Sequence, residues 1–290
     1  MCSHFTRPGD TVFIEEPTYF LAHQIFTDHG LELVGIPMDG QGMRMDAFEE
    51  ALQHHRPRLV YTIPSYHNPT GVTLSGERRR RLAELSRRHD FIIAADEVYQ
   101  LLNYLDQPPP AMGTLCQQGN VLSLGSFSKI MAPALRLGWI QASPALMDHI
   151  MTIGFVNSGG SINHFTSQVM REAIDMGLQQ ALLEELRDAY RRRLTAMDEA
   201  LHQHLDGLAT WQRPGGGYFF WLELTGNADA TALKSRAAEF KTGFQPGPVF
   251  SCGDGFQAFL RLSFAHYRSD EIRAGISRLG RLLKENRGIN

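Results

Sequence analysis

Four short polar patterns in the first half of the chain carry the side chains most capable of chemistry. They combine an amide, a carboxylate, a phenol, hydroxyls, a primary amine and a guanidinium, in Asn68-Pro69-Thr70-Gly71, Asp96-Glu97-Val98-Tyr99, Ser126-Phe127-Ser128-Lys129 and Arg136-Leu137-Gly138. A lysine amine that is partly desolvated and flanked by cations loses its proton easily and becomes a nucleophile. Arginine and serine together suit a phosphate, which accepts charge-assisted hydrogen bonds. Each pattern alone is common in turns and helix caps, so it is their combination that indicates a site.

A further arginine, Arg261, stands inside the apolar segment Leu260-Arg261-Leu262-Ser263-Phe264. Burying an unpaired charge is costly, so an arginine in such a strand is expected to be paired or functional. The residues alone leave two roles open for it, a structural ion pair with an acidic neighbour or a functional role.

The elements that must position these side chains can be predicted from apolar patterning. Apolar or β-branched runs predict strands, and polar amphipathic stretches between them predict helices, with strands at 11–14, 31–36, 59–63, 91–95, 121–124 and 137–140 and helices at 18–29, 44–55 and 75–89. This alternation is typical of an α/β domain with a mostly parallel sheet. The four patterns lie at or near strand ends, where open parallel sheets bind their ligands.

After about residue 160 the pattern changes. Residues 164–204 predict a long helix, the glycine run 214–217 a turn, and 218–222 and 258–264 two further strands. A last helix is expected from about Ser269, with Ser269 as its N-cap. We therefore expect a large domain over residues 1–190 and a smaller α+β domain over residues 191–290.

Composition excludes several classes of protein. The chain is 43% hydrophobic and 20% charged with a formal net charge of −3, which fits a folded chain and gives no reason to expect a nucleic-acid partner. No apolar run reaches the roughly 18 residues of a membrane span, and the start lacks the apolar core of a signal peptide. The three widely spaced cysteines predict free thiols in a reducing, cytoplasmic compartment.

Two charged or histidine-rich features are expected to be structural. The run Glu77-Arg78-Arg79-Arg80-Arg81 predicts a solvated helix face rather than a nucleic-acid patch. The histidines at 54, 55, 202 and 204 lack the spacing of a zinc-binding motif, so no metal site is expected.

Taken together, the four patterns resemble the fold-type I, pyridoxal-phosphate-dependent aminotransferases of class I/II. The resemblance runs from Pro8-Gly9-Asp10 to the last helix. It is closest to the branch containing the 2-aminoadipate and kynurenine aminotransferases, through the segments Glu16-Pro17-Thr18-Tyr19-Phe20, Gly125-Ser126-Phe127-Ser128-Lys129 and Arg136-Leu137-Gly138-Trp139. It implies the aspartate aminotransferase-like fold, which joins a large domain with a mostly parallel sheet to a smaller α+β C-terminal domain.

The resemblance also implies catalytic roles. Lys129 would form an aldimine with the aldehyde of pyridoxal 5'-phosphate and then move a proton at the substrate α-carbon. Asp96 would keep the pyridine nitrogen protonated, so that the ring can accept electrons. Tyr99 and Asn68 would hydrogen-bond the phenolic oxygen of the ring.

The remaining implied roles concern binding. Ser126, Ser128 and Arg136 would hold the cofactor phosphate, with the serine that reaches it left open. Tyr19 would stack on the pyridine face, or it is simply a core tyrosine. Arg261 would clamp the substrate α-carboxylate through two parallel hydrogen bonds, with Asn68 beside it in the substrate site.

The expected function is transfer of an amino group from an amino acid to a 2-oxo acid, in a homodimer. Two alternatives stay open, a carbon–sulfur lyase on the same fold and a truncated, non-catalytic protein of this fold. The second arises because members of the family carry a further N-terminal segment, including a glycine-rich turn that binds the cofactor phosphate at a helix N-terminus. We expect that this sequence lacks that segment. Three explanations stay open: the sequence is a truncated or misassigned reading frame, another chain covers the gap, or cofactor affinity is reduced.

Overall fold

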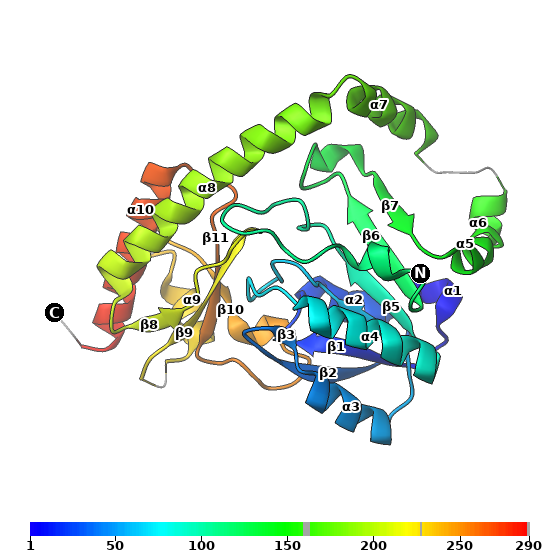
Figure 1. Cartoon of the computed structure of the whole chain (residues 1–290). Helices are drawn as coiled ribbons and strands as arrows, with labels where there is room; N and C mark the ends of the chain where they lie inside the picture. Colours follow the sequence, from blue (N-terminus) through cyan, green and yellow to red (C-terminus); the bar gives the residue numbers. More distant parts are fainter. Residues whose placement is uncertain (159–162, 227, 289–290) are drawn as a thin grey trace.

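A seven-stranded sheet dominates the computed structural model, which describes residues 1–158, 163–226 and 228–288 (Figure 1). Its strand order is β3-β2-β1-β4-β5-β6-β7. The strands are β1 (Thr11–Glu16), β2 (Glu32–Asp39), β3 (Gly42–Met43), β4 (Pro57–Thr62), β5 (Ile92–Asp96), β6 (Val121–Ser126) and β7 (Gly138–Gln141). The neighbours from β2 to β6 are parallel, while β3 and β7 run antiparallel at the two edges. The predicted, mostly parallel α/β sheet is therefore confirmed.

Helices cover both faces of this sheet. They are α1 (Cys2–Phe5), α2 (Phe20–Asp28), α3 (Met45–His54) and α4 (Gly76–His89), with short 3-10 turns η1 (Met112–Leu115) and η2 (Pro133–Leu135). Because side chains alternate along a strand, each strand feeds two separate cores. One core holds Val12, Ile14, Leu59 and Ala94, and the other holds Phe13, Val60, Ile93 and Ala95. We call this sheet and its helices the large lobe.

The second sheet has four antiparallel strands in the order β10-β11-β9-β8. They are β8 (Ala209–Trp211), β9 (Phe219–Leu224), β10 (Gln245–Pro246) and β11 (Phe259–Ser263), accompanied by α9 (Ala230–Arg236), η3 (Gly247–Phe250) and α10 (Ser269–Asn286). We call this unit the small lobe. It is the smaller α+β unit that the sequence predicts.

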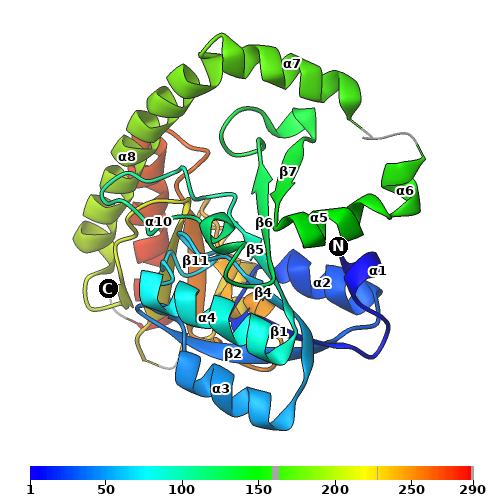
Figure 2. The ribbon, with the colours of Figure 1, turned by 45° about the vertical axis from the view of Figure 1, so that its right-hand side comes forward.

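A long helix links the two lobes. α8 (Leu178–Leu205) packs along α10 at one end and meets α7 (His164–Asp175) at the other, on the side of the molecule that carries β7, α5 (Pro144–Met151) and α6 (Gly154–Asn157) (Figure 2). The single helix predicted over 164–204 is therefore wrong, because Gly177 adopts a left-handed backbone (φ +75°) that ends one helix and begins the next. The expected domain boundary at 190/191 falls inside α8 and stays a prediction.

One smaller expectation also changes. Ser269 is the first residue of α10 rather than its N-cap, and the cap position belongs to Arg268, whose backbone N–H donates to the Glu271 carboxylate at 2.9 Å. Cys2, Cys116 and Cys252 are free thiols, as expected. None of the helices in the described ranges combines the length and apolar character that crossing a membrane requires.

The arginine run on α4 is solvated except at one position. Arg79 is only 1% exposed, so the predicted solvated face is wrong for this residue. Its guanidinium donates to the carbonyls of Leu74, Pro110 and Pro64 at 3.0, 3.0 and 2.7 Å, and to the Ser65 hydroxyl at 2.8 Å. A buried cation needs this many acceptors to offset its desolvation. Arg79 thereby fixes the chain just before the Asn68 loop.

We expect Arg79→Met to destabilise the fold by about 3 kcal/mol, because it leaves several buried oxygens without a donor. Arg80→Met is the matched control, since Arg80 is exposed on the same helix and its loss should change stability by less than about 0.5 kcal/mol. Urea denaturation measures both free energies of unfolding. Equal stabilities for the two variants would contradict the structural role given to Arg79.

Candidate active site

All four polar patterns meet at one edge of the large sheet. β4, β5 and β6 are parallel neighbours, so their carboxyl ends lie together. Asp96 is the last residue of β5, Ser126 is the last of β6, and Asn68 lies on the loop after β4. Arg136 comes just before β7, which is antiparallel to β6 and so starts at the same edge. The sheet topology alone thus brings the predicted residues into one region.

Lys129 lies half-buried on the loop after β6. Desolvation lowers the pKa of its amine; Asp96 opposes this shift, and the positive charges of Arg261 and Arg136 add to it. Among the described residues, its Nζ atom has no hydrogen-bond or ion-pair partner, and it lies 5.6 Å from the centre of the Tyr218 ring. This is the desolvated, cation-flanked setting in which a lysine becomes a nucleophile.

Asp96 is held by a partner that the sequence argument missed. The hydroxyl of Tyr61, a buried residue on β4, donates to Asp96 Oδ2 at 2.8 Å, and the backbone N–H of Val98 donates to the same carboxylate. Burial raises the pKa of Asp96, and these two donors oppose that shift. Burial also holds the pKa of Tyr61 well above its ordinary value, so Tyr61 stays protonated and donates. A tyrosine within an apolar strand needs a polar partner, which is the signal that could have revealed it.

Tyr99 is buried beside Asp96. Desolvation raises the pKa of its phenol, and the Asp96 charge raises it further, so the hydroxyl stays a hydrogen-bond donor. Within the described ranges this hydroxyl makes no hydrogen bond. The phenol is therefore available to a ligand that presents an acceptor.

Arg261 reaches the site from β11 of the small lobe. Its guanidinium lies between two rings, 4.1 Å from the centre of Phe219 and 4.9 Å from that of Phe250, and Nη1 donates to Asn68 Oδ1 at 2.7 Å. Nε is buried without a hydrogen-bond partner, and desolvation lowers the Arg261 pKa to about 10. The described residues give it no acidic partner, so the structural ion pair left open by the sequence is not found. A buried, incompletely satisfied guanidinium suits a carboxylate ligand.

The expected phosphate-binding residues lie on the same loop as Lys129. The Ser126 hydroxyl accepts a hydrogen bond from the Ser128 backbone N–H at 3.1 Å, so it already orders the turn. Arg136 is exposed, and it donates to the Pro133 carbonyl at 3.3 Å. Its charge nevertheless acts on Lys129, which places it on the lysine side of the site.

Tyr19 stands at the start of α2. It packs against the core and contacts Phe20 at a ring-centre distance of 5.4 Å. Burial raises its pKa, and the charges of Asp96 and Arg261 also act on it. Its surroundings are thus compatible with both roles left open, a core tyrosine and a ring beside a bound ligand.

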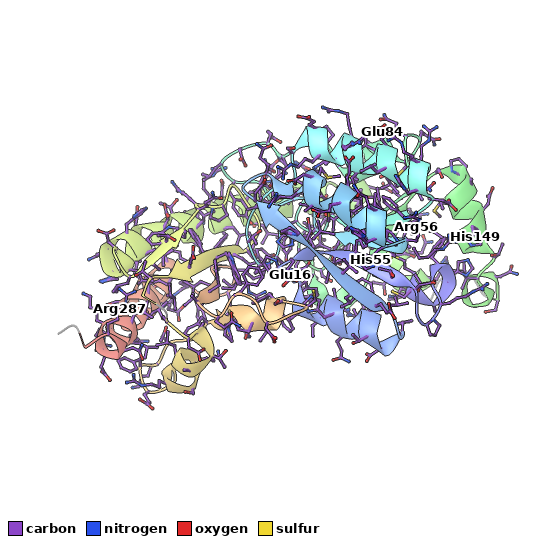
Figure 3. All side chains as sticks on the ribbon, turned by 90° about the horizontal axis from the view of Figure 1, so that it is seen from below. Glu16, His55, Arg56, Glu84, His149 and Arg287 are labelled. Carbon is purple, nitrogen blue, oxygen red and sulfur yellow. The ribbon has the colours of Figure 1, made fainter. Side chains whose placement is uncertain are left out.

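Hydrogen bonds tie the two lobes together at two places. Glu16, at the end of β1, lies between the lobes in Figure 3, and its carboxylate accepts from the Ser251 hydroxyl and from the Cys252 backbone N–H, the latter at 3.1 Å. The second tie is the hydrogen bond between Arg261 and Asn68. We call these two contacts the lobe junction.

The comparisons with known proteins agree on one family. The family model described as "Aminotransferase class I and II" matches residues 1–279. The "Aromatic-amino-acid aminotransferase 1" of Thermococcus litoralis is 34% identical over 286 residues, which are 97% of this chain and 68% of that protein.

Solved structures give the same result. A multiple substrate aminotransferase from Thermococcus profundus superposes with a TM-score of 0.92 at 33% identity, over 99% of this chain and 72% of its own. LysN, the α-aminoadipate aminotransferase of Thermus thermophilus, solved with N-(5'-phosphopyridoxyl)-L-leucine, has a TM-score of 0.90 at 31% identity, over 98% of this chain and 73% of its own.

Proposed function

This chain belongs to the aminotransferase class I and II family, and from that premise we propose that Lys129 anchors pyridoxal 5'-phosphate while an amino group passes from an amino acid to a 2-oxo acid. The observation that supports this best is the convergence on one sheet edge of a partner-free, half-buried lysine amine and a partly buried carboxylate. The structural relative that carries a phosphopyridoxyl group adds support for the cofactor.

Side chains in the site match the aldehyde, the ring nitrogen, the phenolic oxygen and the phosphate of this cofactor. Lys129 offers a free amine for the aldehyde, and Asp96 offers a carboxylate for the ring nitrogen. Tyr99 has a buried hydroxyl without a partner, which suits the phenolic oxygen, with Asn68 nearby. Ser126, Ser128 and Arg136 would hold the phosphate. When bound, the cofactor supplies an aldehyde that bonds to an amine and a protonated ring that draws electrons from it.

The protein's own contribution is proton handling and orientation. Lys129 Nζ, once free, accepts the proton from the α-carbon of the amino acid and can return it, because its lowered pKa favours the neutral amine. Asp96 keeps a proton on the ring nitrogen, since its carboxylate remains an acceptor while Tyr61 occupies Oδ2. Arg261 holds the α-carboxylate, which fixes the α-carbon within reach of the lysine.

The half-reactions test the function directly. Purified protein is mixed with pyridoxal 5'-phosphate, and the visible band of the lysine-bound cofactor is followed by absorbance. A panel of amino acids should bleach that band, and a 2-oxo acid should restore it. No band with the cofactor, or no bleaching with any amino acid, would overturn the proposal. Steady release of ammonia and a 2-oxo acid without an acceptor would instead favour the lyase.

The assembly proposed for this enzyme is a homodimer in the cytoplasm. The support is a set of exposed apolar side chains: Trp139 and Ile140 on β7, Phe165 on α7, and Met176 just after α7 are 41%, 40%, 82% and 71% exposed. Large exposed apolar surface is a feature of proteins that bind other chains. The free thiols support a reducing compartment. Light scattering of the purified protein should give twice the mass of one chain.

Tyr61→Phe is expected to weaken cofactor binding about tenfold, because Asp96 loses a hydrogen bond to its charged form and holds the ring proton less well. Absorbance titration with pyridoxal 5'-phosphate measures the dissociation constant. Tyr66→Phe is the matched control, since the buried Tyr66 hydroxyl donates to another carboxylate, that of Asp106. Equal weakening in both variants would contradict a role of Tyr61 through Asp96.

A further inference from the structure

Tyr218 touches Lys129 in two independent ways. Its hydroxyl donates to the Lys129 backbone carbonyl at 3.2 Å, and the face of its ring lies under Lys129 Nζ at 5.6 Å from the ring centre. The distance is within the roughly 6 Å at which an ammonium is attracted to an aromatic face. Tyr218 is only 8% exposed, so both contacts are sheltered from water.

Further contacts fix the Tyr218 ring in place. Its hydroxyl also lies 3.3 Å from that of Tyr190 on α8, and its ring centre lies 5.4 Å from that of Tyr99. The glycine run ahead of it is packed tightly: Gly217 has φ +68°, and a Cβ there would lie 2.7 Å from the Tyr66 Cβ. Only glycine allows the chain to pass so close before Tyr218 enters the site.

We infer that Tyr218 is a positioning residue for Lys129, its hydroxyl holding the backbone of the lysine loop and its ring holding the free amine. The inference rests on the proposed function, in which Lys129 alternates between a bonded and a free state. When the bond forms, the Lys129 amine adds to the aldehyde carbon, a C=N bond replaces C=O, and one water leaves without any change of oxidation state. Held on the ring of Tyr218 as an ammonium, the lysine is kept in position for that addition, which begins once the ammonium loses its proton.

The two contacts predict graded effects. Tyr218→Phe keeps the ring and removes the hydroxyl, so formation of the lysine-bound band should slow about fivefold. Tyr218→Leu removes both contacts, so the slowing should reach about thirtyfold. The Michaelis constant for the amino acid should stay unchanged in Tyr218→Phe, because neither Arg261 nor Asn68 is touched.

Stopped-flow absorbance after mixing with pyridoxal 5'-phosphate measures the rate, and thermal unfolding checks that each variant is folded. Tyr104→Phe is the matched control, because the buried Tyr104 also donates to a backbone carbonyl, that of Gly217 at 2.9 Å, without touching Lys129. Wild-type rates in both Tyr218 variants, or equal slowing in Tyr104→Phe, would overturn the inference. Absence of the band in the wild-type protein would instead overturn the proposed function.

Discussion

Replacing Lys129 with alanine is expected to abolish the lysine-bound cofactor band and to slow amino transfer by on the order of 10⁴-fold, the upper range for loss of a general acid–base group. The reason is that one side chain serves both steps. It is the desolvated, partner-free amine beside Asp96 that bonds the aldehyde, and it is the base that takes the α-proton. Absorbance spectra and single-turnover rates with an amino acid measure the two losses separately.

The chain provides clean controls for this experiment. It has four lysines, and those at 241 and 284 are exposed in the small lobe. Lys284→Ala should bind cofactor and turn over as the wild type does. An unchanged band in Lys129→Ala, or its loss in Lys284→Ala, would show that another amine carries the chemistry.

Arg261→Leu is expected to lower kcat/KM for amino acids about 1000-fold, since it removes two charge-assisted hydrogen bonds of about 1.5–3 kcal/mol each. The cofactor band should persist without substrate, because Lys129 and Asp96 remain. The unpartnered Nε and the flanking rings of Phe219 and Phe250 are the features that predict this effect. Steady-state kinetics with the cofactor in excess measure it.

Arg236→Leu is the matched control, because Arg236 also lies over an aromatic ring, 5.8 Å from Phe240, but outside the site. Its loss should leave kcat/KM within about twofold of the wild-type value, as for a typical surface change.

The pH dependence of inhibitor binding gives a second check. The Arg261 pKa is about 10, so its guanidinium is charged below that pH, and a simple carboxylate inhibitor should bind up to about pH 10 and weaken above it. Tight inhibitor binding by Arg261→Leu would refute the carboxylate clamp.

The sequence predicts well those features that depend on patterns within a short stretch of residues. Apolar runs locate the parallel strands, and strand ends then place Asn68, Asp96 and Lys129 at one edge of the sheet, because parallel neighbours share that edge. Arg261 stands out for the same kind of reason, as a charge inside an apolar strand. These are one-dimensional signals with a direct physical meaning.

Pairings between distant segments could not be predicted in this way. Tyr61 and Tyr218 each lie in apolar strands or at their start, and nothing nearby in sequence shows that their hydroxyls reach Asp96 and the Lys129 carbonyl. The prediction of a solvated position for Arg79 is wrong for a similar reason. Its neighbours in the sequence are exposed arginines, but the backbone carbonyls that accept its hydrogen bonds, those of Pro110 and Pro64, come from loops. The contacts that refine the site are therefore tertiary, whereas those that locate it are local.

The hydrogen bond between Arg261 and Asn68 couples ligand affinity to the relative position of the two lobes. It is one of several hydrogen bonds between the two lobes, and it uses the same guanidinium that a substrate carboxylate would engage. A ligand that competes with Asn68 for the Arg261 guanidinium weakens or breaks this hydrogen bond between the two lobes. Thermodynamic reciprocity then requires that anything which spreads or closes the sheets changes ligand affinity by the same factor.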